Sequence, residues 1–226
     1  MYFCIDMKIG IRAIGLRSQS WKDKYKSYPA LSYVQDTTSH NEFDVFIDLN
    51  WDENPENIAD YAGNKNTLFV LGSNLTTIEE ALKSTHIPYD GQKFIGINSF
   101  PYLIERNTWE ACNPFDIDTQ YFQTLLDYLQ IESCEWLKSR VGFFTPRVLC
   151  MIINEAYYTV QEGTASKSDI DVAMKLGTNY PKGPFEFCDL FGIELVYKQL
   201  EALYQDTHDE RYKICPLLKS EYLKHS

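Results

Sequence analysis

The first half of the chain alternates short apolar runs with polar segments, a pattern typical of strands separated by turns and helices. Strands are predicted over residues 1–7, 8–16, 31–37, 43–50, 67–74 and 93–100. Residues 43–50 are nearly continuous in apolar side chains, as expected of a buried parallel strand. Short helices are predicted over residues 54–63 and 78–84, whereas the charged stretch 21–30 is predicted to be a loop or a poor helix. The alternation predicts a mostly parallel sheet.

The second half of the chain has a helical period instead. Residues 118–131 predict one helix, and residues 194–205 and 216–224 predict two more. A longer apolar stripe, wide enough for more than one side of a helix, is formed by Val148, Leu149, Ile152, Ile153, Ala156, Tyr157 and Val160. The predicted fold class is therefore α/β plus all-α. A mostly parallel sheet domain over residues 1–140 is followed by an all-α domain over residues 141–226.

The stretch from Ser166 to Leu190 carries dense helix-boundary signals. Ser166 can cap a helix, with Asp169 three residues later, and Gly177 is predicted to supply the left-handed stop. Pro184 then opens a second short helix at its first position. By these signals alone, the stretch could be a helix-turn-helix fragment of any α-helical domain.

Charge and cysteine usage exclude several classes of protein. The net charge of −11 argues against nucleic acid or an anionic membrane as a partner. The six cysteines are scattered without a CxxC pair, which favours reduced thiols and a cytoplasmic protein over a disulfide framework. The N-terminus has no signal-peptide pattern, and no apolar run approaches the roughly 20 residues that span a bilayer.

The stretch 169–186 closely resembles the C-terminal helical domain of the 3-hydroxyacyl-CoA dehydrogenase family, where a run like DIDxAMKLGxxxPxGPFE is a hallmark. The chain keeps Asp169-Ile170-Asp171, Ala173-Met174-Lys175-Leu176-Gly177, Pro181 and Gly183-Pro184-Phe185-Glu186 in register. The resemblance extends over about residues 43–223. It implies a truncated Rossmann-like domain over residues 1–140 and a helical dimerisation domain over residues 141–226. It also implies an NAD-dependent oxidoreductase of fatty-acid metabolism that forms a homodimer through its C-terminal helices.

The dinucleotide-binding turn that the resemblance implies is not recognisable. A Gly-x-Gly-x-x-Gly turn lets the backbone approach a pyrophosphate at a helix N-terminus. The chain offers only Gly10 and Gly15, five residues apart, and no amphipathic helix of normal length is predicted after them. We therefore expect that the cradle is absent and that NAD is not bound tightly.

Two later motifs of the family do have counterparts. Its acidic strand-end motif corresponds to residues 46–52, which makes Asp48 and Asp52 candidate cofactor-binding residues. Its Ser-Asn motif corresponds to residues 73–78. By this resemblance Ser73 and Asn74 are candidates for the cofactor, and Thr76 and Thr77 for the substrate. Ser-Asn after a strand is also ordinary turn chemistry, so both interpretations stay open.

The resemblance also implies a catalytic histidine that is oriented by a glutamate twelve residues later. The register gives Asn98 at the histidine position and Glu110 at the glutamate position. An asparagine amide cannot accept and return a proton near neutral pH. A substrate-steadying asparagine of the family is likewise replaced by Pro146, which has no side-chain donor. The four histidines, His40, His86, His208 and His225, match no family position and are expected at the surface.

Three interpretations follow. The favoured one is a dehydrogenase-fold protein that has lost hydride transfer and acts as an acyl-CoA-like ligand binder or a dimeric partner. The second is an active NAD-dependent 3-hydroxyacyl-CoA dehydrogenase with an atypical site or one completed by another subunit. The third is a structural interaction protein whose ligand cleft is closed.

Overall fold

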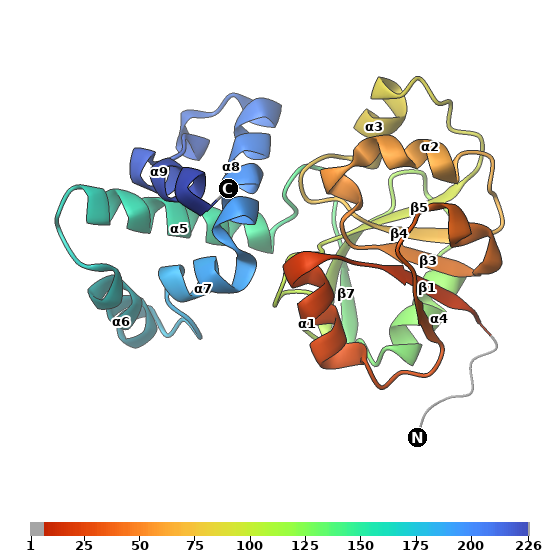
Figure 1. The fold of residues 1–226 in the computed structure, drawn as a ribbon, viewed down its shortest axis with the longest axis horizontal. Helices are drawn as coiled ribbons and strands as arrows, with labels where there is room; N and C mark the ends of the chain where they lie inside the picture. Colours follow the sequence, from red (N-terminus) through yellow and green to blue (C-terminus); the bar gives the residue numbers. More distant parts are fainter. Residues whose placement is uncertain (1–6, 226) are drawn as a thin grey trace. The chain divides into compact units, whose positions relative to one another are not determined.

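The computed structural model describes residues 7–225, so the strand predicted over residues 1–7 lies, apart from Met7, outside the described residues. The chain divides into two compact units, with the break between Phe143 and Phe144 (Figure 1). The sequence placed this break at residue 140. Of the described residues, none belongs to a helix that is long and apolar enough to span a membrane.

The described part of the first unit contains one seven-stranded sheet, in the order β2-β1-β3-β4-β5-β6-β7. The strands are β1 (Ile9–Arg12), β2 (Leu31–Tyr33), β3 (Val45–Asp48), β4 (Leu68–Gly72), β5 (Lys93–Ile97), β6 (Thr108–Cys112) and β7 (Ser133–Trp136). The helices are α1 (Gly15–Tyr25), α2 (Ile58–Tyr61), α3 (Ile78–Ser84) and α4 (Gln120–Tyr128). Neighbouring strands are parallel except for β5 and β6. The mostly parallel sheet that the sequence predicted is confirmed.

Helix α1 corrects the sequence interpretation, which placed a strand over residues 8–16 and a loop or a poor helix over residues 21–30. The strand ends at Arg12 and an 11-residue helix begins at Gly15. Its inward face repeats every fourth residue as Arg17, Trp21 and Tyr25, all buried, and the two rings lie 4.4 Å apart. The helix was missed because its inward face includes a charged residue, Arg17, and therefore shows no regular apolar period.

Strands β6 and β7 were not predicted. β6 contains the Trp109-Glu110-Ala111-Cys112 segment and runs antiparallel to β5. β7 then pairs parallel to β6 after the crossover through α4. These two strands extend the sheet beyond β5 and place Glu110 on a strand beside the end of β5.

The core of the first unit lies on both faces of the sheet. Alternate residues of β3 divide between the faces: Val45 and Ile47 pack with side chains of α1 and α4, and Phe46 packs with side chains of α2 and α3. All three are fully buried. Burying each such side chain contributes about 1.5–3 kcal/mol. Both faces are therefore committed to packing, and the free ends of the strands are left for a site.

The second unit is all-helical, as predicted (Figure 1). Its helices are α5 (Thr145–Gln161), α6 (Lys167–Thr178), α7 (Pro184–Phe191), α8 (Ile193–Thr207) and α9 (Pro216–His225). Helix α5 packs against α7, α8 and α9. Leu149, Ile153 and Tyr157 of the long apolar stripe are buried, as are Phe185 and Phe191 of α7. Within the unit, the neighbouring helices therefore cover these side chains, whereas Val148 stays 38 % exposed.

The motif shared with the dehydrogenase family has a structural basis in the α6–α7 turn. A carboxylate oxygen of Asp171 accepts the backbone N–H of Phe185 at 2.9 Å. A Cβ on Gly183 would lie 2.2 Å from that same oxygen, so glycine is required there. Glu186 accepts the N–H of Gly183 at 2.9 Å and is ion-paired with Lys175. The carboxylates of the motif therefore hold the turn.

The end of α6 differs from the prediction in one respect. Helix α6 runs through Gly177 to Thr178, and the left-handed residue is Asn179, with φ of 56°. Asparagine tolerates this conformation because its short polar side chain bonds locally. The cap predicted at the other end is confirmed, because Ser166 and Asp169 form a reciprocal capping box.

Candidate active site and cofactor crevice

Strand order reverses at β1. Strand β2 lies on one side of β1 and β3 on the other, both parallel to it. In open α/β sheets ligands bind outside the carboxyl ends of the strands at such a switch point. Here the flanking turns are residues 13–15, between β1 and α1, and residues 49–53, after β3. The candidate residues Asp48 and Asp52 both lie at this edge.

The turn from β1 into α1 has the strand-turn-helix layout of a dinucleotide site but not its glycines. It reads Ala13-Ile14-Gly15-Leu16-Arg17-Ser18. Gly15 has φ of 58°, a conformation that favours glycine. Gly10 lies inside β1, where a Cβ would lie 2.6 Å from the Phe43 ring. The N–H of Ile14 donates to Asn50 Oδ1 at 2.8 Å, so a side chain of the neighbouring turn already occupies this donor.

Asp48 is the centre of a buried hydrogen-bond network. It accepts from Arg12 Nη1 at 3.0 Å, from the Tyr61 hydroxyl at 2.9 Å and from the backbone N–H of Asn50 at 3.1 Å. Burial raises the pKa of the Asp48 carboxyl, and the Arg12 guanidinium opposes that rise. The carboxylate is thus fully engaged within the protein.

Asp52 connects three loops. It accepts Arg17 Nη1 at 2.6 Å and the backbone N–H groups of Asn74 and Leu75 at 2.8 and 3.1 Å. Arg17 Nη1 also donates to the carbonyl oxygen of Leu49. Burial raises the pKa of the Asp52 carboxyl, and Arg17 lowers it. This ion pair ties α1 to the ends of β3 and β4.

Sequence reasoning missed Arg12, Arg17, Asn50 and Tyr61, which bind the two candidate aspartates or close the turn beside them. A signal for Arg17 was present, since it lies four and eight residues before Trp21 and Tyr25 on one helix face. Arg12 is the last residue of β1 and lies opposite Asp48 of β3. This contact depends on the register of the two strands, which the sequence pattern did not reveal.

The Ser-Asn motif divides into two roles. The Asn74 carboxamide oxygen accepts the backbone N–H of Ser99 at 2.9 Å, and its Nδ2 donates to Asn98 Oδ1 at 3.0 Å. The Thr77 side chain instead caps α3, and both Thr76 and Thr77 hydroxyls donate to Glu80. Asn74 therefore joins the predicted catalytic position, whereas the two threonines take part in the α3 cap.

Asn98 and Glu110 are brought together. Asn98 follows β5, Glu110 lies on β6, and Asn98 Nδ2 donates to Glu110 Oε2 at 3.2 Å. Asn98 Oδ1 accepts from Asn74 Nδ2 and from the backbone N–H of Phe100 at 3.1 Å. Two donors on the oxygen fix the amide orientation, so the NH₂ group faces the carboxylate. Each of the two side chains belongs to a residue only 8 % exposed.

In this arrangement the amide of Asn98 holds the position that the resemblance gives to a general base. An amide cannot act as general base near neutral pH, and the acceptor that Glu110 presents is directed at the amide N–H. Ser73, also buried, lies next to Gly96, where a Cβ would lie 2.4 Å from its hydroxyl oxygen. The described residues contain no group of three or more His, Cys, Asp or Glu side chains able to hold a metal ion.

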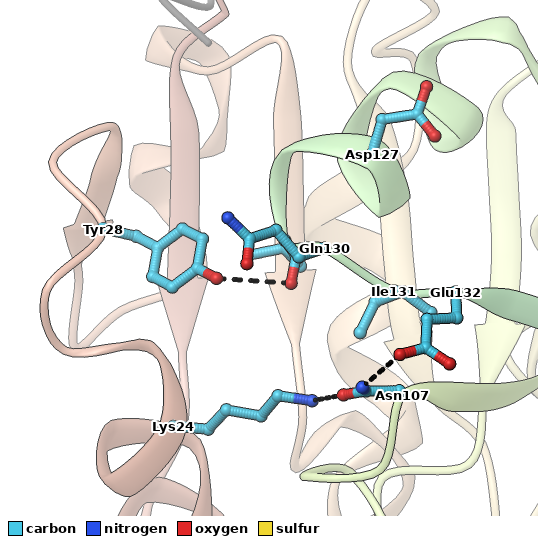
Figure 2. A pocket seen from close by; sticks show the side chains of 8 residues that line it. Lys24, Tyr28, Asn107, Asp127, Gln130, Ile131 and Glu132 are labelled. Carbon is cyan, nitrogen blue, oxygen red and sulfur yellow. Dashed lines mark hydrogen bonds between the residues drawn. The ribbon is translucent and has the colours of Figure 1, made fainter. Parts of the chain in front are cut away.

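A cavity of about 450 Å³ lies elsewhere in the first unit. It is lined by residues of α1, the loop before β6 and the end of α4. There Lys24 donates to Asn107 at 2.8 Å and Asn107 donates to Glu132 at 2.8 Å (Figure 2). A second cavity, of about 260 Å³, is lined by residues such as Asn41, Asn64 and Thr67. None of the candidate site residues lines either cavity.

Comparison with known proteins supports the resemblance. Residues 142–225 match the family model for the 3-hydroxyacyl-CoA dehydrogenase C-terminal domain. A 3-hydroxybutyryl-CoA dehydrogenase of Clostridioides difficile is 29 % identical over 202 residues, which cover 83 % of this chain and 69 % of that protein. A probable 3-hydroxybutyryl-CoA dehydrogenase of Bacillus subtilis (strain 168) is 43 % identical over 83 residues, which cover 37 % of this chain and 29 % of that protein. Residues 142–225 thus carry the C-terminal domain of the 3-hydroxyacyl-CoA dehydrogenase family, and most of the chain is similar to a dehydrogenase of this family.

A solved structure agrees with the two-part fold. The (S)-3-hydroxybutyryl-CoA dehydrogenase of Ralstonia eutropha superposes with a TM-score of 0.72 over 97 % of this chain and 94 % of its own, at 19 % identity. At that identity the comparison shows the fold alone. The first unit is thus a Rossmann-type sheet and the second is the family's helical domain.

Pro146 and the histidines have structural roles or ordinary surface positions. Pro146 lies in the first turn of α5, where its missing N–H costs nothing, and it is buried. His40 is buried between Phe46, Tyr61 and Phe69, so the surface position expected for it is wrong. His86 and His208 are exposed, and the side chain of His225 lies outside the described residues.

The residues at the switch point do not fit the pyrophosphate of the NAD that this family uses. Ala13 and Ser18 stand where the turn would carry its first and third glycines. The Ile14 N–H is occupied by Asn50, and the crevice side of α1 holds the buried Arg17–Asp52 pair. We therefore derive no chemical step through NAD.

Proposed function

We propose that this chain is a 3-hydroxyacyl-CoA dehydrogenase-fold protein without hydride-transfer activity, which acts as an acyl-CoA-like ligand binder or a dimeric partner protein of fatty-acid metabolism. The observation that carries this proposal is the contact between Asn98 and Glu110. The pair keeps the place and spacing of a general base and its orienting carboxylate, but the base is an amide. Loss of a general base costs about 10²–10⁴-fold in rate.

The cofactor part of the proposal is that NAD is not bound tightly. It is supported by Ala13 and Ser18 in the turn and by the occupied N–H of Ile14. Three of the residues proposed from the resemblance for the cofactor, Asp48, Asp52 and Asn74, form side-chain hydrogen bonds with neighbouring segments. The fourth, Ser73, is buried and donates its backbone N–H to the Ile97 carbonyl. Such internal satisfaction favours a site that is stable without the cofactor.

The partner part of the proposal is a homodimer formed through the C-terminal helical domain. Helix α6 has no buried residue in the single chain, and Val172 and Leu176 are 51 % and 83 % exposed. They lie four residues apart on one helix face. A twofold pairing is the commonest way to cover such a face in a soluble protein. We also propose a cytoplasmic location, from the scattered cysteines of the sequence.

The alternative is an active NAD-dependent dehydrogenase with an atypical site. One observation favours it: the carboxylate of Glu110 is held at the family position, beside a strand end. For this alternative to hold, another group, for example from a second subunit, must supply the base. Nothing in the positions of His40, His86 or His208 supplies it within the described residues.

The test is a thermal-shift screen of the purified protein with NAD, NADH and a series of saturated acyl-CoAs. A ligand that binds the folded state raises the melting temperature by mass action. The proposal predicts a shift with an acyl-CoA and none with NADH. A shift with NADH would contradict the cofactor part of the proposal, and no shift with any compound would favour the purely structural role.

A further inference from the structure

The crevice at the switch point is filled by the chain's own side chains. Arg17 reaches from the first turn of α1 to the end of β3, where its guanidinium contacts the Leu49 carbonyl oxygen and both oxygens of Asp52, at 2.6 and 3.4 Å for the latter. The Arg17 side chain is 2 % exposed and that of Asp52 is 0 % exposed. The pair is therefore inside the protein and takes up the space between the two turns.

Further hydrogen bonds around this pair connect the segments that follow β1, β3 and β4. Leu49 N–H donates to the Arg12 carbonyl at 2.9 Å, and Asn50 Oδ1 accepts the Ile14 N–H at 2.8 Å. Asp52 continues the chain of contacts to the loop after β4 through the N–H groups of Asn74 and Leu75. The ends of three neighbouring strands are thereby joined without any bound molecule.

The local charge also disfavours an anion. Arg17 is neutralised by Asp52, and Glu53 lies 3.9 Å away from Arg17 as a second acid. Arg12 is likewise neutralised by Asp48. A phosphate that approached the α1 N-terminus would find both guanidinium groups ion-paired with buried carboxylates. The N–H groups of Arg12 and Arg17 that lack a hydrogen-bond partner, at Nε, are themselves buried. Backbone N–H groups and the helix dipole attract phosphate only where the donors are free.

We propose that the Arg17–Asp52 pair is an internal plug that closes this crevice to dinucleotides and other phosphate-bearing nucleotides. The plug, and not the missing glycines alone, is the barrier. This inference rests on the cofactor part of the proposed function, that NAD is not bound tightly, and identifies the groups that prevent binding. It does not depend on the residue at position 98.

The experiment compares three forms of the full chain. The glycine variant Ala13→Gly/Ser18→Gly restores small residues in the turn and keeps the plug. The combined variant adds Arg17→Met and Asp52→Asn, which remove both charges at similar side-chain volume. Both partners are replaced because removing one would leave a buried charge unpaired. Each protein is titrated with NADH by calorimetry, and its folding is checked by circular dichroism.

We expect no saturable NADH binding by the wild type or the glycine variant, and binding by the combined variant at least about tenfold tighter than that of the glycine variant. The inference is overturned if the wild type or the glycine variant binds NADH with a Kd below about 0.1 mM. It is also overturned if a folded combined variant binds no better than the glycine variant. Should the combined variant not fold, the glycine variant alone decides, since binding by it contradicts the plug and absence of binding supports it.

The failure of this inference differs from failure of the proposed function. NADH binding by the wild type without turnover would refute the plug and leave the loss of the base intact. Turnover by the wild type would refute the proposed function itself.

Discussion

The side-chain amide of Asn98 donates to the carboxylate of Glu110 at 3.2 Å, across the ends of two antiparallel strands. The contact joins the two positions that the resemblance gives to a general base and its orienting carboxylate. A carboxylate facing an imidazole can orient a base, but a carboxylate facing an amide N–H can only fix its position. Because Asn74 and the Phe100 N–H hold the amide oxygen, no rotation of the amide improves this.

Two glycines of the family motif provide a matched pair of substitutions. Gly183→Ala should destabilise the helical unit by about 1–3 kcal/mol, because the new Cβ would lie 2.2 Å from Asp171 Oδ1. Gly177→Ala should stabilise it by about 0.5–1 kcal/mol, because Gly177 lies within α6 and its Cβ would meet no atom within 4 Å. Urea unfolding of both variants measures these changes. Equal effects of the two substitutions would show that the Asp171 contact does not hold the turn.

The Lys167–Glu221 pair gives a pH prediction for α9. The Tyr157 hydroxyl donates to Glu221 at 2.9 Å, and Lys167 donates to both its oxygens at 2.8 and 2.7 Å. Burial raises the pKa of Glu221, but these partners outweigh burial and hold the pKa below its usual value. A depressed folded-state pKa stabilises the protein above the unfolded value of about 4.3, and this contribution is lost as pH falls through the folded pKa.

Glu221→Gln should therefore cost about 1 kcal/mol at pH 7, and its difference from the wild type should shrink as pH falls below about 4. Glu194→Gln is the control, since Glu194 forms an i,i+4 pair with Lys198 on the surface and is 64 % exposed. Denaturant unfolding at several pH values measures both. A Glu221→Gln difference that stays constant down to pH 3 would contradict the role of the ionised pair.

The position of α6 leads to a prediction of oligomeric state. The wild type should scatter light with a mass twice 26.3 kDa, because Val172 and Leu176 of α6 are left exposed in the single chain. Leu176→Glu should give a folded monomer, since the side chain makes no buried contact in the chain itself. Leu223→Glu, at an exposed position of α9, is the control and should leave the mass unchanged. A monomeric wild type would contradict the predicted homodimer.

A charged substitution of Ile153 does not test the dimer. The Ile153 side chain is 0 % exposed in the single chain, so a charge there is expected to unfold the helical unit.

Local patterns predicted most of the fold. Elements whose signal comes from residues adjacent in sequence were predicted, and the structure confirms them. They are the buried strand within residues 43–50, the helix over residues 78–84 and the helices of the second unit. Helix α1 was missed because its inward face includes Arg17, and β7 because its residues are mostly exposed. The Arg17–Asp52 pair spans 35 residues and depends on the register of β1 and β3, which no local pattern encodes.

Only part of the candidate site could be predicted from the sequence, because its contacts join residues of different strands. Asn98 and Glu110 are twelve residues apart and meet because β5 and β6 are adjacent. Their proximity was predicted from the family resemblance. It was not predicted from the sequence pattern of β6, which was not recognised as a strand. The structural role of Thr77 was visible in sequence, since Thr77 and Glu80 have the spacing of a capping box.

We expect this protein to perform no hydride transfer from 3-hydroxyacyl-CoA to NAD. The direct measurement is the formation of NADH, followed by its absorbance, when the purified wild type is incubated with NAD and (S)-3-hydroxybutyryl-CoA at pH 7–9. The account predicts no rate above the background without enzyme, and predicts the same for Asn98→His because the crevice stays closed. Wild-type turnover at an ordinary enzyme rate of about 1 s⁻¹ or more would contradict it.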